Sequence, residues 1–332
     1  MLLSDLITSP WSLAVASFLA CAAALPLVLF FSRRSHFNAA PGPLDIHTRP
    51  ISRLAGVGIL LGLLLALAIS PIFHFRDHLA FLVALLLVWL TGLADDLRRL
   101  PPLLRFLLQT ASAILLWWAG WRFPVPALAS LLLTWFFVVL FINAFNMLDG
   151  ADGLAAAVSA VISLGFLLWF VSTADFLGAA VAAALLGACV GFLLFNFPPA
   201  KIFMGDSGSY TLGFLIAFLS LEFYRYQPAP GLHWLLPLLL AALPLLDLFF
   251  AVLRRLANGL SPFTGDRRHF YDLLLQRGWS PRRVCAISSL GTAVLVLLGW
   301  LFGGENVSVL FPLAGMLALC AAVAAFYAAS SS

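Results

Sequence analysis

The stretch FLGAAVAAALLGACVGFLLFN, residues 176–196, contains no charged side chain. A helix needs about 20 mostly apolar residues to cross a bilayer, and it satisfies its own backbone hydrogen bonds where lipid offers none. This stretch therefore predicts a transmembrane helix. The whole chain has the same character, because 63% of its 332 residues are hydrophobic and only 10% are charged. A soluble domain carries about 25% charged residues.

Apolar runs of similar length recur along the chain, separated by short polar breaks. They predict an all-α integral membrane protein with about eleven transmembrane helices, forming one domain over residues 1–332. No internal repeat is apparent, and no segment is left for a separate soluble domain. The predicted helix cores are 11–31, 54–72, 78–94, 103–120, 125–145, 154–172, 176–196, 209–223, 232–253, 283–302 and 307–328.

Basic residues divide unequally between the two predicted faces. With the N-terminus outside, all of the 18 Lys and Arg residues except Arg76, Arg122 and Arg225 fall on the inner side. Inner loops of membrane proteins are enriched in Lys and Arg, so this division predicts an N-out, C-in orientation. In the long inner loop, apolar side chains at positions 270, 273 and 274 follow helical spacing and predict a short interfacial helix.

Charge and cysteine content argue against two other classes of protein. The net charge of +4 comes from basic residues beside apolar runs, and these residues form no continuous stripe for nucleic acid. The four cysteines are scattered without paired spacing. This indicates small buried side chains and neither a zinc site nor a disulfide framework.

Most acidic residues gather at the inner face. A carboxylate in the middle of the bilayer costs about 2.5–3.5 kcal/mol on insertion scales. Placing several at one face avoids most of this cost and concentrates negative charge that needs a cation. Of the 14 acidic residues, those predicted at the inner face are Asp45, Asp95, Asp96, Asp149, Asp152, Asp206, Asp247, Asp266 and Asp272.

The first polar cluster is the pair Asp95-Asp96, at the inner end of the third predicted span. Adjacent carboxylates repel each other, so the pair favours a metal ion or another positive partner. Basic residues follow at positions 98, 99 and 105. The alternative is a solvated helix end with local ion pairs.

The second cluster is NAFNMLDGADG, residues 143–153. Asn143, Asn146 and Asp149 are spaced by three and share one helix face if the helix persists. Asp152 continues this spacing, and the two Asp-Gly steps predict a tight turn. The alternative is an ordinary connecting turn, although two amides and two carboxylates are many for one short connection.

The third cluster is KIFMGDSGS, residues 201–209. Asp206 stands where a helix N-cap belongs, and the glycines on either side allow a ligand to approach the backbone closely. A helix N-terminus also favours phosphate, and Lys201 would add positive charge. The alternative is a plain N-cap after the Pro-Pro break that precedes it.

The fourth cluster is Asp266-Arg267-Arg268-His269. Arginine suits two-point contacts with phosphate, and histidine can form hydrogen bonds or relay protons. The alternative is a solvated basic loop on anionic lipid. Asp247, near the inner end of a span, fits equally a satisfied polar contact within the membrane and a carboxylate that faces the site.

Together the four clusters combine oxygen ligands for a hard cation with basic groups for phosphates. Mg²⁺ suits this set, because it binds through one or two carboxylates together with substrate phosphates. The matching chemistry is phosphoryl transfer, which depends on positioning and charge neutralisation. The alternative function is a cation- or proton-coupled transporter, which predicts ionisable groups near the bilayer midplane and often an internal repeat.

In this order, the clusters resemble the polyprenyl-phosphate N-acetylhexosamine-1-phosphate transferases, the membrane family of MraY- and WecA-like enzymes. The matching stretches are LADDLRRL at 93–100, NAFNMLDGADGLA at 143–155, PPAKIFMGDSGSYTLGF at 198–214 and DRRH at 266–269. PISRLAGVGI at 50–59 and PLLDLFFAVLRR at 244–255 extend the resemblance. It covers nearly the whole chain from about residue 33 to residue 283.

The resemblance implies a role for each matching position. Asp206, with Asn146 nearby, corresponds to the Mg²⁺ site, for which Mn²⁺ is an expected substitute. Asp95 corresponds to a carboxylate proposed to deprotonate the lipid phosphate. The residues implied in catalysis are Asp95, Asp96, Asp149, Asp152 and His269, and those implied in substrate binding are Asn143, Asn146, Arg105, Lys201, Ser209, Arg267 and Arg268.

The implied reaction is attack by the phosphate of undecaprenyl phosphate on the β-phosphorus of a UDP-sugar, with release of UMP. Many members have a His-rich stretch in the last loop, whereas only His269 remains here. This resembles the O-antigen-initiating branch, whose donors include 6-deoxy N-acetylhexosamines as well as N-acetylhexosamines. The implied location is the bacterial inner membrane, with a cytoplasmic active site. A homodimer is left open.

Overall fold

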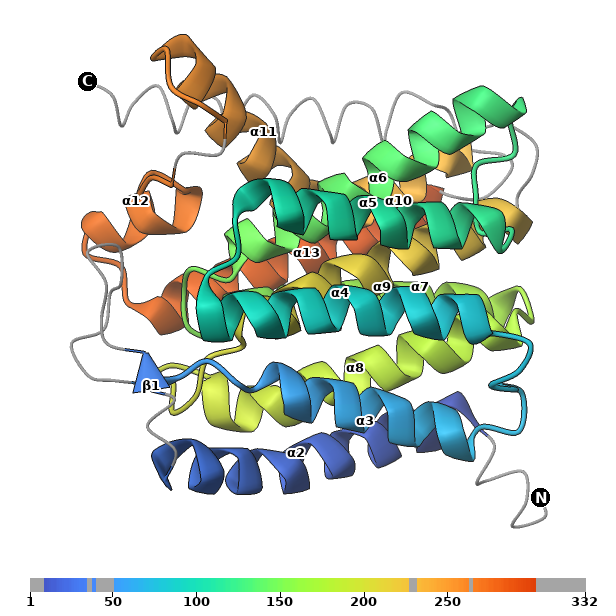
Figure 1. The fold of residues 1–332 in the computed structure, drawn as a ribbon, viewed down its shortest axis with the longest axis horizontal. Coiled ribbons are helices and arrows are strands. Elements are labelled where there is room, and N and C mark those ends of the chain that lie inside the picture. The colour runs from blue at the N-terminus through green and yellow to red at the C-terminus, as the bar shows by residue number, and fades with distance from the viewer. Residues whose placement is uncertain (1–8, 35–37, 40–50, 227–231, 263–264, 303–332) are drawn as a thin grey trace.

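The computed structural model describes residues 9–34, 38–39, 51–226, 232–262 and 265–302. In these residues the long helices lie side by side in one bundle (Figure 1). They are α2 (Pro10–Arg34), α3 (Gly56–Ile69), α4 (Leu79–Arg98), α5 (Pro102–Trp118), α6 (Ala127–Leu148), α7 (Leu154–Ser172), α8 (Phe176–Asn196), α9 (Gly205–Tyr226), α11 (Ala242–Ala257) and α13 (Pro281–Phe302). The shorter elements are β1 (Asn38–Ala39), β2 (Ile51–Ser52), the 3₁₀ helix η1 (Leu232–Leu235), α10 (Leu236–Leu240) and α12 (Phe270–Gln276).

Helix α9 forms the centre of the bundle. Helices α4 and α6 pack along it, and α3, α7 and α8 also contact it. Every side chain from Ser207 to Tyr224 is buried. Glycines allow two neighbours to approach its first turn closely, because an added methyl group at Gly56 of α3 or Gly92 of α4 would meet backbone atoms of residues 206–208. The start of α9 is therefore held by direct backbone packing.

The outer surface of the bundle is apolar. Trp118 is 75% exposed and Leu128 is 71% exposed, which is unfavourable in water and favourable in lipid. Within the described residues, six helices are long and apolar enough to cross a membrane, namely α2, α4, α6, α7, α8 and α13. The chain is therefore a multi-pass membrane protein.

Ten of the eleven predicted spans coincide with helical segments of the structure. The ninth differs in one respect, because the predicted single helix over 232–253 is broken at Ala241, between α10 and α11. Pro244 lies in the first turn of α11 and has no N–H to donate to the carbonyl of Leu240, which favours a break at this point. The eleventh span, 307–328, lies outside the described residues. The count of eleven and the N-out, C-in orientation therefore stay predictions.

All four polar clusters lie at one end of the bundle. The ends of α4, α6 and α8 meet the starts of α5, α7 and α9 there, beside α12 and β1 (Figure 1). The two short strands pair antiparallel, and the second continues along the loop before α9. The N–H of Phe203 donates to the carbonyl of Ser52 (2.8 Å), and that of Gly56 donates to the carbonyl of Met204 (3.1 Å). Helix α12 is the short helix that the sequence predicts in the last loop.

Candidate active site

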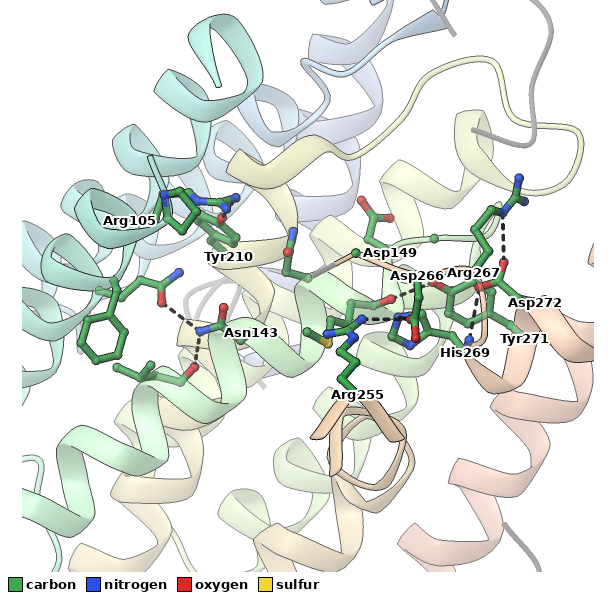
Figure 2. A pocket seen from close by; sticks show the side chains of 18 residues that line it. Arg105, Asn143, Asp149, Tyr210, Arg255, Asp266, Arg267, His269, Tyr271 and Asp272 are labelled. Atoms are coloured by element: carbon green, nitrogen blue, oxygen red, sulfur yellow. Dashed lines mark hydrogen bonds and ion pairs between the residues drawn. The ribbon is translucent and has the colours of Figure 1, made fainter. Parts of the chain in front are cut away.

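A cavity of about 400 Å³ lies at this end of the bundle. Figure 2 shows Arg105 and Tyr210 on one side of it and Asp266, His269 and Tyr271 on the other. The wall combines α5, α6, α9 and α11 with the segment that leads into α12. The lining residues are Pro102, Arg105, Phe106, Gln109, Val139, Asn143, Asn146, Met147, Asp149, Gly150, Tyr210, Arg255, Gly265, Asp266, Arg267, His269, Tyr271 and Asp272.

Asp95 forms an ion pair with Arg105 behind one wall of the cavity. Oδ2 of Asp95 accepts a hydrogen bond of 2.7 Å from the guanidinium group of Arg105, and Oδ1 accepts one of 2.6 Å from the backbone N–H of Leu100. Arg105 also donates to the hydroxyl of Tyr210 (3.4 Å). The Asp95 side chain is 6% exposed and that of Arg105 is 30% exposed. Arg105 thus brings positive charge to the cavity, and Asp95 orients it from behind.

Asp96 points to a different partner, the first turn of α9. Its Oδ1 accepts from the N–H of Asp206 (2.7 Å), and its Oδ2 accepts from the N–H (3.0 Å) and the hydroxyl (2.8 Å) of Ser207. The first N–H groups of a helix lack partners within the helix, and negative charge is favourable there. Gly205 allows this contact, because its φ is 72° and a side chain there would overlap Asp96. Asp96 therefore holds the start of α9 in place.

Asp206 and Asn146 lie together, as the family resemblance implies. The amide nitrogen of Asn146 donates to Oδ1 of Asp206 (2.7 Å) and to the hydroxyl of Ser209 (3.1 Å). Asn146 lines the cavity. Asp206 lies behind it, with Asp95 and Asp96 as like-charged neighbours. Three carboxylates therefore gather at one point beside the cavity.

This group of carboxylates fits a hard cation such as Mg²⁺. In the described part of the chain, no three His, Cys, Asp or Glu side chains form a ready set of metal ligands. Mg²⁺ does not need such a set, because it binds through one or two carboxylates, water and substrate phosphates. Asp95 is bound to Arg105 and Leu100, and Asp96 to the start of α9, so Asp206 is the carboxylate that we expect to hold the ion. Asn146 turns its nitrogen toward Asp206, so its role as a ligand stays a prediction.

Asn143 presents a second amide to the cavity from α6. Its amide nitrogen donates to the side-chain oxygen of Gln109 (2.9 Å) and to the backbone oxygen of Val139 (2.7 Å). Both amide hydrogens are used in these two bonds. The amide oxygen is therefore the atom available to a ligand, and Figure 2 shows it on the side away from the two acceptors.

The two carboxylates of the second cluster have different surroundings. Asp149 directly follows α6 and lines the cavity, whereas Oδ2 of Asp152 accepts from the N–H of Ala200 (2.9 Å) and joins two loops. Burial raises the pKa of Asp149 well above its ordinary range, and repulsion from Asp96 adds to the effect, which Arg53 partly opposes. Asp149 therefore has a raised affinity for a proton at the cavity wall.

Asp149→Asn is expected to raise the thermal midpoint of the protein at neutral pH. A carboxyl with a raised folded-state pKa stabilises the fold fully only below its unfolded-state pKa, and this contribution is lost as the pH rises through the folded-state pKa. Asparagine does not ionise, so the gain over wild type should grow as the pH rises above about 4, the ordinary pKa of an aspartate, toward the raised folded-state pKa. Tryptophan fluorescence in detergent measures the midpoint.

The control for this prediction is Asp77→Asn, an exposed residue at the opposite end of the bundle. It should show no gain that grows with pH. If the gain from Asp149→Asn were the same at both ends of the pH range, ionisation of Asp149 would not be its cause.

Gly150 is packed against Tyr271. The Tyr271 hydroxyl donates to the backbone oxygen of Met147 (3.0 Å), and an added methyl group at Gly150 would overlap that hydroxyl.

Gly150→Ala should displace α12 from the end of α6 and lower turnover about tenfold, since overpacking costs about 1–3 kcal/mol. Gly291→Ala in α13, where a methyl group meets open space, should leave turnover and thermal midpoint unchanged. Normal turnover in Gly150→Ala would show that the site tolerates a shift of α12.

Asp266 anchors the fourth cluster to α11. Its Oδ2 accepts from two nitrogens of Arg254 (2.8 and 3.2 Å), and its Oδ1 accepts from Arg255 (3.0 Å). Burial acts to raise the pKa of Asp266, but the bonds from the two arginines outweigh it and hold the pKa below its ordinary value. Arg255 also donates to the backbone oxygen of Pro262 (2.8 Å). It lines the cavity and adds a second positive charge there.

The two basic side chains of the fourth cluster that line the cavity are Arg267 and His269. Nε of Arg267 lies 3.8 Å from Oδ1 of Asp272. His269 is buried, and its Nδ1 lies 2.6 Å from Oδ2 of Asp247. Of the two interpretations of Asp247, the structure shows the satisfied polar contact. Asp247 does not line the cavity, and its oxygens contact His269, which does, and the N–H of Phe270. Arg268 is exposed and is absent from the lining.

Most of the predicted site residues are brought together. Those that line the cavity are Arg105, Asn143, Asn146, Asp149, Arg267 and His269, and those joined to this wall by contacts are Asp95, Asp96, Asp206 and Ser209. Asp152, Lys201 and Arg268 do not line it, and their roles stay predictions. The lining also includes four polar residues that the sequence analysis does not single out, Gln109, Tyr210, Arg255 and Tyr271.

Comparison with known proteins identifies the family. The model of glycosyl transferase family 4 matches residues 78–224, which include the first three clusters. A decaprenyl-phosphate N-acetylglucosaminephosphotransferase of Mycobacterium tuberculosis (strain ATCC 25618 / H37Rv) is 33% identical over 296 residues, covering 77% of this chain and 73% of that protein. The chain belongs to glycosyl transferase family 4.

Other members of glycosyl transferase family 4 agree. The probable undecaprenyl-phosphate N-acetylglucosaminyl 1-phosphate transferase of Bacillus subtilis (strain 168) is 29% identical over 273 residues, covering 79% of this chain and 74% of that protein. The undecaprenyl-phosphate alpha-N-acetylglucosaminyl 1-phosphate transferase of Escherichia coli (strain K12) is 28% identical over 296 residues, covering 82% and 79%. The resemblance to the polyprenyl-phosphate N-acetylhexosamine-1-phosphate transferases is confirmed, and the chain is an enzyme. The transporter alternative gains no support.

Proposed function

We propose that this enzyme transfers a sugar 1-phosphate from a UDP-sugar to undecaprenyl phosphate and releases UMP. The observation that carries the proposal is the cavity, where Arg105, Arg255 and Arg267 lie beside a group of carboxylates. The donor diphosphate and the acceptor phosphate bring several negative charges together, and guanidinium groups bind phosphate oxygens in pairs. Two relatives are undecaprenyl-phosphate N-acetylglucosaminyl 1-phosphate transferases, which supports the same acceptor and an N-acetylhexosamine phosphate.

The proposed reaction is direct in-line transfer without a covalent enzyme intermediate. An oxygen of the lipid phosphate bonds to the β-phosphorus of the donor, while the bond from that phosphorus to the bridging oxygen breaks. UMP leaves with the bridging oxygen and its electron pair. Asp95 is the candidate to accept a proton from the lipid phosphate, and Arg105 neutralises charge on the diphosphate. A phospho-aspartate trapped at Asp149 or Asp152 would overturn direct transfer.

Mg²⁺ is the proposed cofactor, with Mn²⁺ as a substitute. Asp206 would hold the ion, with Asn146 beside it. When bound, the ion would supply charge neutralisation at the donor diphosphate. Removal of divalent ions with EDTA should abolish turnover, and added Mg²⁺ should restore it. Full turnover in EDTA would remove the metal from the proposal.

We place the reaction at the cytoplasmic face of a bacterial inner membrane, where it would initiate a cell-envelope glycan such as O-antigen. The positive-inside distribution of Lys and Arg supports this face. The single histidine of the fourth cluster, His269, supports a donor from the O-antigen-initiating branch, an N-acetylhexosamine or its 6-deoxy form.

A donor panel tests the proposed function. The purified enzyme would be supplied with undecaprenyl phosphate, Mg²⁺ and, in turn, UDP-N-acetylglucosamine, UDP-N-acetylgalactosamine and their 6-deoxy counterparts. We expect UMP release and a lipid-linked sugar diphosphate with at least one donor. UMP release that does not depend on the lipid, or no product from any donor, would contradict the proposal.

A further inference from the structure

Asp247 is a buried carboxylate with two specific contacts at the start of α12. It is 2% exposed and belongs to α11. Its Oδ2 lies 2.6 Å from Nδ1 of His269, and its Oδ1 accepts from the backbone N–H of Phe270 (3.0 Å). A carboxylate removed from water is costly unless its oxygens are satisfied. Here both oxygens are used on two adjacent residues of another segment.

The contact determines which ring atom of His269 is available. A carboxylate only accepts hydrogen bonds, so Nδ1 carries the proton in this contact. Nε2 is then the atom left for a ligand, and it lies 3.8 Å from Oδ1 of Asp266, a residue that lines the cavity. The ring stacks on Tyr271 with centroids 5.4 Å apart and an interplanar angle of 5°. His269 is therefore restrained at its edge and on its face.

Helix α11 holds the same segment at a second point. Arg254 and Arg255, two turns beyond Asp247, bind the carboxylate of Asp266. Asp266 and His269 are three residues apart, so the helix fixes both ends of the fourth cluster. Rigid support of this kind is what a reacting or binding group needs to keep its geometry.

We infer that Asp247 is a positioning residue, whose carboxylate holds the His269 ring so that Nε2 faces the phosphates of the bound donor, to which it donates when both ring nitrogens carry a proton. This rests on the proposed function, since the donor is part of it. The competing explanation is purely structural, in which Asp247 only caps α12 through the N–H of Phe270. The two explanations differ in whether the effect of Asp247 passes through the imidazole ring.

A double-mutant cycle separates them. The variants are Asp247→Asn, His269→Gln and the double variant, assayed for UMP release with the donor that wild type uses. We expect Asp247→Asn to lower kcat about 10–100-fold, the range for partners that orient an active group, with less effect on KM. His269→Gln should cost at least as much. The double variant should be no slower than His269→Gln alone, because the two residues act as a unit.

Asp175→Asn is the matched control. Asp175 is also a fully buried aspartate, and it caps α8 by accepting from the N–H of Gly178 (3.0 Å) at the opposite end of the bundle. This variant keeps an oxygen for the N–H of Gly178 and should leave kcat unchanged. A loss of kcat in Asp247→Asn that persists in full on the His269→Gln background would overturn the inference, and so would a normal kcat with a lowered midpoint.

A second measurement does not depend on turnover. In enzyme labelled with ¹⁵N-histidine, the Nδ1 proton of His269 should give a ring signal that disappears in both Asp247→Asn and His269→Gln. The same signal in wild type and Asp247→Asn would contradict the contact. If Asp247→Asn does not fold, Asp247→Glu retains the carboxylate, and its failure to restore both the signal and turnover would count against positioning. Wild-type inactivity with every donor would instead contradict the proposed function.

Discussion

Asp206→Asn is expected to reduce turnover by about 1,000-fold, the upper range for losing one preorganised electrostatic contact to a transition state. Asp206 is the carboxylate that fits a cation beside the cavity, and its Oδ1 already accepts a bond from Asn146. Asparagine removes the charge that would attract the cation and can turn a second donor toward Asn146. Turnover would be measured as UMP release over a range of Mg²⁺ concentrations.

The same variant should keep or raise the thermal midpoint. Asp95 and Asp96 are like-charged neighbours of Asp206, so a neutral side chain there relieves repulsion. A folded, inactive protein that extra Mg²⁺ does not restore is the expected result. Wild-type turnover in Asp206→Asn would remove the metal role from this residue.

The helices of this protein are predictable because lipid imposes a simple condition on the sequence. A run such as 176–196 must satisfy its backbone within itself, and the structure has α8 over Phe176–Asn196. The break before α11 is harder to predict. Pro237 and Pro244 lie within one apolar run, and proline is tolerated in the first turn of a helix. Their positions are compatible with a continuous kinked helix as well as with two helices.

The candidate site is predictable where its residues come in clusters at helix ends. Asp206 and Asn146 are 60 residues apart in the sequence, and a hydrogen bond of 2.7 Å joins their side chains, as the family resemblance implies. Residues that line the cavity but lie outside the clusters are not recognisable from the sequence in this way. Gln109 is a single amide in an apolar helix, and its contact with Asn143 depends on how α5 packs against α6.

Two further residues that line the cavity lie next to the clusters in the sequence, and this position indicates that they could contribute to the site. Tyr210 directly follows the third cluster and Tyr271 lies two residues beyond the fourth, and both line the cavity. Arg255 belongs to a basic pair at a helix end, which on sequence alone is indistinguishable from an arginine at the lipid surface. Its place in the cavity depends on the bond from its guanidinium group to Asp266.

Asp95 and Asp96 are adjacent in the sequence, but their side chains point in different directions. Consecutive residues of a helix point about 100° apart, since a turn holds about 3.6 residues. One side chain therefore faces Arg105 at the cavity wall, and the other faces the start of α9. The sequence alone suggests that the two carboxylates act as one unit. In the structure Asp95 binds a guanidinium group, whereas Asp96 binds two backbone N–H groups and a hydroxyl.

Asp95→Asn and Asp96→Asn are therefore expected to impair the enzyme in different ways. Asp95→Asn keeps an oxygen for the N–H of Leu100 but loses the ion pair with Arg105. Arg105 is 30% exposed, so water can solvate it and the thermal midpoint should change little. Turnover should fall about 100-fold or more, the range for loss of a general base.

Asp96→Asn should lower the thermal midpoint by several degrees. The carboxylate accepts three hydrogen bonds at the start of α9 from Asp206 and Ser207, and an amide offers one oxygen in its place. Leaving a buried donor unsatisfied costs about 1–3 kcal/mol. Turnover falls because the turn that carries Asp206 is no longer held.

Temperature separates the two variants. Cooling should restore part of the turnover of Asp96→Asn relative to wild type, because the displaced turn is ordered again as the fold becomes more stable. Cooling should not restore Asp95→Asn, which lacks a group that the reaction needs at every temperature. The measurements are the thermal midpoint and UMP release at several temperatures. Equal midpoints and equal losses of turnover in both variants would show that the two carboxylates do act as one unit, and the separate contacts to Arg105 and α9 would then not determine their roles.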